Sequence, residues 1–77
     1  MSIDSIFHRL PESVKRDVID FTDCHLKDGR DALRITLDRI LTEAEKARMK
    51  SKHIVGVDCL CQYRYAPEIR HSYFYLV

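Results

Sequence analysis

The sequence is poor in glycine and proline, with two of each among 77 residues, and it has no long apolar run. With 45% hydrophobic and 32% charged residues, this composition excludes a disordered or low-complexity chain. The lack of an apolar stretch of roughly 20 residues excludes a membrane-spanning helix and predicts a soluble protein. We expect one small domain over residues 1–77, whose core is thin enough that a second subunit would stabilise it.

The chain also lacks a dominant charge, because 13 Lys and Arg residues face 12 Asp and Glu residues and leave a net charge of +1. A molecule so nearly neutral creates no strong long-range field, so any attraction to nucleic acid or to an acidic partner must be local. The three cysteines are an odd number, and the mixed, polar N-terminal stretch has no secretory signal. Reduced thiols in the cytoplasm are the simplest prediction.

Apolar residues recur with helical spacing through the first half of the chain. A short leading helix is predicted from the positions of Ile3, Ile6, Phe7 and Leu10. Pro11 fits the first turn of a second, amphipathic helix over residues 11–27. Gly29 would end this helix in a left-handed conformation, so that a third helix over about 31–50 folds back against it. The expected N-terminal half is therefore a helical hairpin.

One alternative stays open for the third of these segments. The stretch ALRITL, residues 32–37, also alternates with a period of two, as a strand does. The stretch TEAE, residues 42–45, has the form of a capping box at the beginning of a helix. A strand followed by a shorter helix therefore competes with one continuous helix.

From His53 onward the apolar residues alternate with a period of two, as in a half-buried strand. One side of this strand would carry Val55, Val57, Cys59, Cys61, Tyr63 and Tyr65. Pro67 interrupts the pattern, and the stretch IRHSYFYLV is rich in residues that favour a second strand. The predicted fold is α+β: an N-terminal helical hairpin, made of a short leading helix and two amphipathic helices, followed by a C-terminal antiparallel β-hairpin.

Cys59 and Cys61 raise the question of a metal site. A C-x-C pair on a straight strand holds its sulfur atoms roughly 7 Å apart, which is too far for two ligands of one zinc ion. Apolar packing of both thiols is the prediction, with structural zinc at a bent strand and reactive thiol chemistry as lesser alternatives. No spacing pairs a cysteine with a histidine base, so we expect no catalytic residues, no metal, no cofactor and no enzymatic activity.

A basic run offers a candidate contact for nucleic acid. It contains Lys46, Arg48, Lys50 and Lys52. On a continuous helix these cations would surround its C-terminal end instead of forming a stripe, and each would interact favourably with the helix dipole by ~0.3–1 kcal/mol. The helix end therefore explains the run without a partner, and a phosphate contact is the alternative.

Aromatic and arginine side chains gather in the predicted hairpin. The candidate partner-binding residues are Tyr63, Arg64, Tyr65, Arg70, Tyr73, Phe74 and Tyr75. Such residues stack nucleic-acid bases on sheets of three or more strands, but only two strands are visible in the sequence. Tyrosine and arginine are also enriched at protein interfaces, so a protein partner is the expected one.

The expected function is that of a small, non-enzymatic regulator, inhibitor or adaptor that binds another protein. The alternative is a nucleic-acid-binding regulator that uses the basic helix end with Arg64 and Arg70. A chain of this size would suit a protein encoded by a mobile element, a link that rests on association alone.

The last strand is also a candidate for self-association. The stretch SYFYLV contains no Pro, Gly or charged residue, so it lacks the devices that usually prevent pairing between sheet edges. Pairing of Ser72–Leu76 with a second copy would cover the aromatic side and enlarge the thin core. A homodimer through the C-terminal strand is therefore one prediction, and coverage of the same edge by an N-terminal segment or by the partner protein is the alternative.

Overall fold

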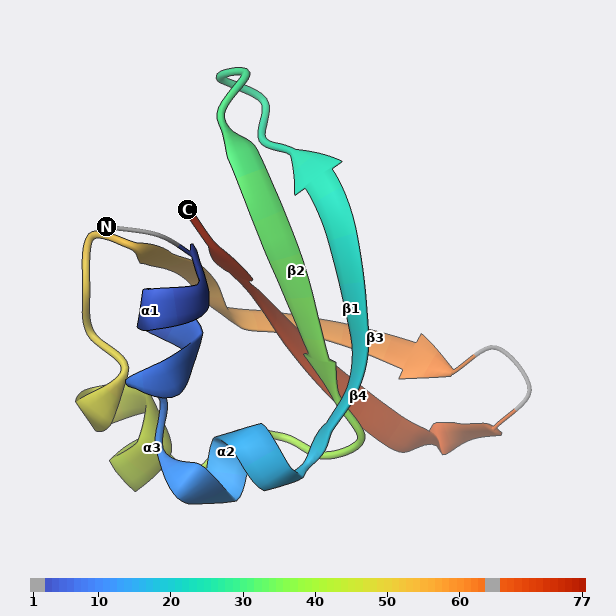
Figure 1. The fold of residues 1–77 in the computed structure, drawn as a ribbon. Coiled ribbons are helices and arrows are strands. Elements are labelled where there is room, and N and C mark those ends of the chain that lie inside the picture. The colour runs from blue at the N-terminus through green and yellow to red at the C-terminus, as the bar shows by residue number, and fades with distance from the viewer. Residues whose placement is uncertain (1–2, 64–65) are drawn as a thin grey trace.

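The computed structural model describes residues 3–63 and 66–77, and for residues 58, 59, 61–63 and 66–69 it describes the backbone alone. Over these residues the elements are α1 (Ile3–His8), α2 (Glu12–Arg16), β1 (Val18–His25), β2 (Asp31–Leu37), α3 (Glu43–Arg48), β3 (Ile54–Tyr63) and β4 (Ala66–Leu76). The strands form one antiparallel sheet in the order β1-β2-β4-β3 (Figure 1). The α+β class and the β-hairpin of β3 and β4 are confirmed.

The predicted N-terminal helical hairpin is wrong, because the second half of residues 11–27 forms a strand and not a helix. Helix α2 ends at Arg16, and β1 begins two residues later. This segment contains β-branched and aromatic residues, which favour the extended conformation once a neighbouring strand is available. The first half of the chain therefore contributes the hairpin of β1 and β2 in place of two long helices.

Gly29 closes this β-hairpin instead of ending a helix. The Gly29 amide donates to the Leu26 carbonyl at 2.9 Å, and the Leu26 amide donates to the Arg30 carbonyl at 2.9 Å. Gly29 has φ 89°, which a residue with a side chain adopts only with strain. The turn is thus a tight hairpin connection that needs a glycine at this position.

For residues 31–50 the strand-then-helix alternative is correct, and the continuous helix is wrong. The strand β2 buries Ile35 and Leu37, two positions apart, against the core. Thr42 then caps α3, because its hydroxyl oxygen accepts a hydrogen bond from the Glu45 amide at 3.1 Å and the Glu45 carboxylate accepts one from the Thr42 amide at 2.9 Å. The capping box visible in TEAE is therefore present.

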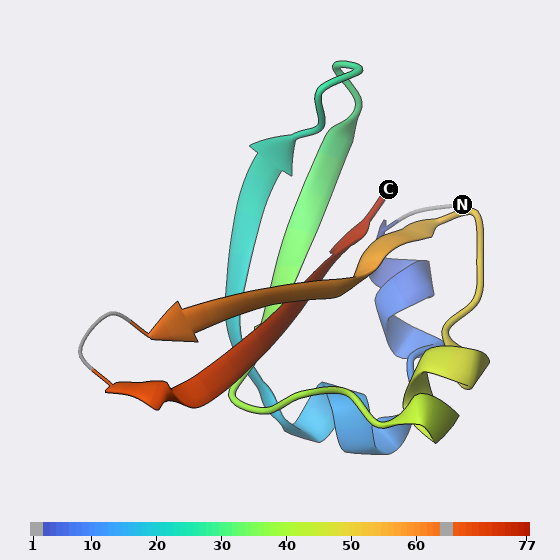
Figure 2. The same cartoon turned by 180° about the vertical axis from the view of Figure 1, so that it is seen from behind.

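The core lies between the helices and one face of the sheet (Figures 1 and 2). It is formed by Ile6, Leu10, Val14, Ile35, Leu37, Leu41, Met49, Phe74 and Leu76. The helices have only five or six residues and would not be stable in isolation. Apolar side chains of α1 and α2, such as Ile6 and Val14, pack in the core, whereas α3 is held by the buried Glu45 carboxylate and by Met49 directly after it. Within the described ranges, no helix is long and apolar enough to cross a membrane.

Strand β4 lies in the interior of the sheet. Residues 72–76 pair with β2 on one side, and β3 occupies the other side (Figure 1). The backbone edge that was expected to recruit a second copy is therefore already used within the chain. The outer strands of the sheet are β1 and β3.

A partly buried ion network joins the helices to the sheet. The Arg39 guanidinium donates to Asp17 at 2.7 Å and to both Glu45 oxygens at 2.7 and 2.8 Å. Glu45 also accepts from the Ser13 hydroxyl, and the Ser72 hydroxyl donates to the Arg39 carbonyl at 2.7 Å. The hydrogen bonds from Arg39 hold the pKa of Glu45 well below its ordinary range. This network fixes the loop between β2 and α3 against α2, β1 and β4.

Candidate functional site

The two faces of the sheet differ in what covers them. Along β4 the side chains alternate, and Ser72, Phe74 and Leu76 are buried against the helices. Tyr73 and Tyr75 point to the opposite face and are half-buried. Figures 1 and 2 show the described helices together on the first face. We call the opposite side, which no described element covers, the open face.

Three side chains form a compact group near the middle of the open face. The Arg34 guanidinium carbon lies 5.9 Å from the centre of the Tyr73 ring, a cation–π contact. The Tyr73 and Tyr75 rings meet edge to face, with their centres 5.9 Å apart. Arg34 comes from β2, where it pairs with Tyr75 of β4. We call Arg34, Tyr73 and Tyr75 the Arg34–tyrosine cluster.

Arg34 carries an unsatisfied hydrogen-bond donor. Its Nε atom is buried and has no hydrogen-bond partner among the described residues. A buried N–H without an acceptor costs roughly 1–3 kcal/mol, so native structures rarely leave one unpaired. The Arg34 guanidinium therefore has a hydrogen-bonding capacity that the described residues do not use.

The structure divides the predicted partner-binding residues. Tyr73 and Tyr75 reach the open face, and Arg70 is exposed on β4. Phe74 is 0% exposed and belongs to the core, so it is not available to a partner. The side chains of Tyr63, Arg64 and Tyr65 lie outside those described.

Arg34 is the member of the cluster that sequence reasoning did not include. It was expected on the third helix, where its neighbours in space would have been residues three and four positions away. The period-two pattern of ALRITL was the signal that could have placed it opposite the last strand.

The outer strand β1 adds an apolar border to the sheet. Ile19 and Phe21 are 51% and 53% exposed. The Phe21 ring contacts Phe7 of α1 edge to face, with the ring centres 5.6 Å apart. This border lies on the same edge as Asp20 and Asp23, which are exposed.

The predicted nucleic-acid contacts gather at one end of the molecule. Helix α3 ends at Arg48, so Lys50 and Lys52 lie in the connection to β3 and do not surround a helix end as expected. A cavity of about 270 Å³ is lined by Arg9, Arg48 and Lys50. A neighbouring cavity of about 340 Å³ is lined by Lys46 and again Lys50. Arg9, from the N-terminal segment, is a member that the basic run does not contain.

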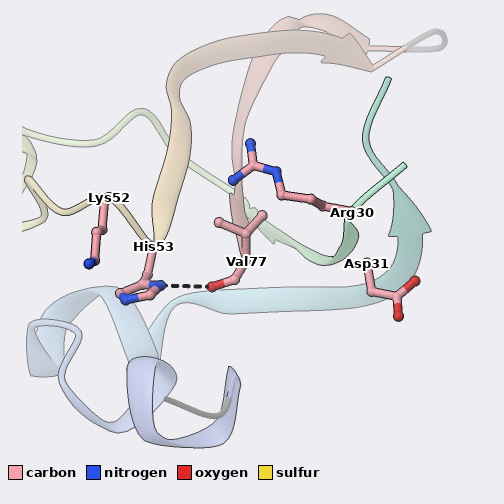
Figure 3. A pocket seen from close by; sticks show the side chains of 5 residues that line it. All are labelled: Arg30, Asp31, Lys52, His53 and Val77. Atoms are coloured by element: carbon pink, nitrogen blue, oxygen red, sulfur yellow. Dashed lines mark hydrogen bonds between the residues drawn. The ribbon is translucent and has the colours of Figure 1, made fainter. Parts of the chain in front are cut away.

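A third cavity, of about 500 Å³, joins this basic end to the β1–β2 hairpin. Figure 3 shows Arg30 on one side and Lys52 with His53 on the other, while the Asp31 carboxylate points away from them. His53 Nδ1 lies 3.2 Å from the Val77 carbonyl oxygen. Arg30 is ion-paired with Asp28 at 2.7 Å, so its charge is partly neutralised.

No metal centre is found in the part of the chain that the structure describes. Among these residues no group of three or more His, Cys, Asp or Glu side chains could hold a metal ion. Cys24 is a free, half-buried thiol on β1. The side chains of Cys59 and Cys61 lie outside the described ones, so their predicted packing stays a prediction.

Comparison with protein families, curated proteins and solved structures found no match to this chain. The function must therefore be argued from the geometry of the open face and of the basic end.

Proposed function

We propose that this chain is a non-enzymatic binding module that recognises another protein through the open face and acts as a regulator, inhibitor or adaptor. The observation that carries this proposal is the Arg34–tyrosine cluster, in which the buried Nε of Arg34 has no acceptor among the described residues. The partner group that fits it is a carboxylate or carbonyl oxygen presented beside apolar surface.

The physical chemistry of the cluster supports a protein partner. Tyr73 and Tyr75 offer rigid rings with few rotatable bonds, so little conformational entropy is lost when a partner orders them. Arginine and tyrosine are among the residues that contribute most to binding energy at protein interfaces. An acceptor that reaches Arg34 would also satisfy its buried N–H, a gain that the unbound protein does not have.

The test is affinity capture from cytosol with wild-type chain and two variants, read by mass spectrometry with and without nuclease. A specific partner should be retained after nuclease treatment, lost with Arg34→Gln and retained with Arg16→Gln, an exposed arginine on α2. Binding of that partner, once purified, should show the same order of affinities by calorimetry. Equal capture by all three proteins would contradict the use of the open face.

Nucleic acid is the second candidate, and one observation favours it. The sheet has four strands, so the objection that a two-stranded hairpin is too small for a base-stacking platform no longer holds. Tyr73 and Tyr75 would stack bases, and cations such as Lys50 and Lys52 would meet phosphates. Binding of single strands at about 150 mM salt, lost with Lys50→Glu and Lys52→Glu, would favour this candidate over a protein partner.

Self-association is a further part of the proposal, with a changed geometry. Since residues 72–76 of β4 are paired on both sides within the chain, a second copy would have to meet the open face or another part of the sheet edge. Sedimentation equilibrium with wild type and Tyr73→Ala is the direct measurement. A dimer that Tyr73→Ala converts to monomer would place the self-contact on the open face.

A further inference from the structure

We propose that the cavity bounded by Arg9, Arg48 and Lys50 binds the phosphate group of a nucleotide-sized phosphate monoester. This inference goes beyond the protein-binding function, because the cavity lies at the basic end and shares no lining residue with the Arg34–tyrosine cluster. We call it the basic cavity.

Two segments that are distant in the sequence bring cations to the basic cavity. Arg9 follows α1, Arg48 is the last residue of α3, and Lys50 lies in the connection to β3. A cation after a helix C-terminus is favourable in itself, which accounts for Arg9 and for Arg48 singly. Neither helix end explains why both converge with Lys50 on the same cavity.

The charge of the basic cavity fits a doubly charged anion. The three cations have a formal charge of +3, and none of the described residues that line the cavity is acidic. A single carboxylate would neutralise one of them, whereas a phosphate monoester carries close to two negative charges and three acceptor oxygens. Arginine forks and a lysine together suit such a group.

Neutral donors complete the site. Ser51 accepts a hydrogen bond from the His53 amide at 3.1 Å, so the hydroxyl hydrogen of Ser51 is available to donate to an anion. Ser51 and His53 both line the basic cavity. The site thus combines charged and neutral donors within a concave surface, which a simple solvated patch of lysines does not.

The floor of the basic cavity is apolar, which indicates more than inorganic phosphate. Ile6 and Met49 are buried, and Ile54 is half-buried. The neighbouring cavity shares Met49, Lys50, Ser51 and Ile54 and extends the apolar surface to Val57. A ribose and base carried by the phosphate would cover this floor, while the charged group stays at the rim.

Two kinds of ligand carry such a phosphate monoester: a free nucleoside monophosphate, and the phosphorylated 5′ end of a single-stranded nucleic acid. The first probes are adenosine 5′-monophosphate, adenosine and inorganic phosphate, measured by calorimetry and by amide chemical shifts. We expect the monophosphate to bind more tightly than either of its parts and to shift the amides of residues 48–54. Equal affinity for inorganic phosphate, equal affinity for adenosine, or no binding would each overturn the proposal.

Single substitutions test which side chains bind the phosphate group. Arg48→Gln and Lys50→Gln should each weaken monophosphate binding about tenfold, because each removes a charge-assisted hydrogen bond. Arg16→Gln and Lys27→Gln remove exposed cations elsewhere and are the matched controls. An equal loss in all four variants would show a diffuse charge effect and contradict a built site. Arg34→Gln should leave this binding unchanged, so the inference and the proposed function can fail separately.

Oligonucleotides with and without a 5′ phosphate distinguish these two kinds of ligand. If a single strand with a 5′ phosphate binds more tightly than the monophosphate, the site recognises nucleic-acid ends. If the monophosphate binds as tightly or more tightly, the ligand is a free nucleotide. Equal binding of the strand without its 5′ phosphate would assign the affinity to internal phosphodiesters and overturn the proposal.

Discussion

The two faces of the sheet use alternate residues of the same strand for different purposes. On β4, Phe74 is buried among helices and satisfied by apolar contacts, whereas Tyr73 beside it contacts an arginine whose Nε lacks a partner among the described residues. The covered face is packed against the helices, whereas the open face has a hydrogen-bond donor without a partner among the described residues. We therefore expect substitutions on the covered face to change stability and substitutions on the open face to change binding.

The largest effect is expected for Phe74→Ala. Removing a fully buried ring leaves a cavity between the helices and the sheet and should lower the free energy of unfolding by about 3–5 kcal/mol. Urea denaturation followed by circular dichroism is the measurement. Tyr75→Ala, one residue further along β4, is the control. A loss as large for Tyr75→Ala would show that the open face is as necessary to the fold as the covered one.

A somewhat smaller decrease in the free energy of unfolding is expected for Glu45→Ala. The Glu45 side chain is only 9% exposed and accepts two hydrogen bonds from Arg39, which would lose its main partner. We expect a loss of about 3 kcal/mol, near the lower end for broken buried ion pairs because Arg39 keeps some contact with solvent. Glu43→Ala, which removes an exposed pair with Lys46, should cost less than about 1 kcal/mol. Similar losses for both variants would contradict the role of the Arg39 network.

The same network predicts the direction of the pH dependence. Hydrogen bonds from Arg39 lower the pKa of Glu45 in the folded state below its ordinary value of 4.5. The stabilisation is therefore fully present above pH 4.5, and it decreases as the pH falls from there towards the folded-state pKa. Denaturation curves at several acidic pH values should show this decrease, and Glu45→Gln should reduce the slope. An unchanged slope would assign the acid sensitivity to other carboxylates.

The smallest effect on stability is expected for Arg34→Met on the open face. The substitution removes a cation–π contact, but it also removes a buried N–H without an acceptor, so the two changes offset each other to within about 1 kcal/mol. Binding of the protein partner should nevertheless fall by more than about tenfold. Thermal unfolding and calorimetry on the same preparations measure both quantities. A strongly destabilised variant, or one that binds its partner normally, would remove the distinction between the faces.

The two hairpins of the sheet show why half of the fold could be predicted. In β3 every second residue from Val55 to Tyr63 is apolar or aromatic, and the end of β4 is rich in aromatic residues, which favours strands over helices. In β1 the half-buried positions do not alternate cleanly, because this outer strand is largely exposed on both sides. Val14, Val18 and Phe21 then happen to match the spacing of a helix, so a local pattern indicated the wrong element. Only the pairing with β2, a nonlocal interaction, decides for the strand.

The candidate site, like the fold, could be predicted only in part from the sequence. Alternation along the last strand separated Phe74 from the tyrosines, but it could not tell which set would face the helices. Arg34 was not predicted as a site residue because its segment was predicted to be a helix. Its position opposite Tyr75 exists only in the sheet. The approach of Arg9 to the basic run depends in the same way on tertiary packing.

The central position of β4 has a consequence for the order of folding during synthesis. On the ribosome, β1 and β2 emerge well before the segment that must insert between β2 and β3. Until Phe74 and Leu76 arrive, the side of β2 away from β1 has no neighbouring strand, and the short helices have little surface on which to pack. The nascent chain therefore exposes the unpaired side of β2 until translation has passed β4, and during that interval a chaperone would find its binding surface there.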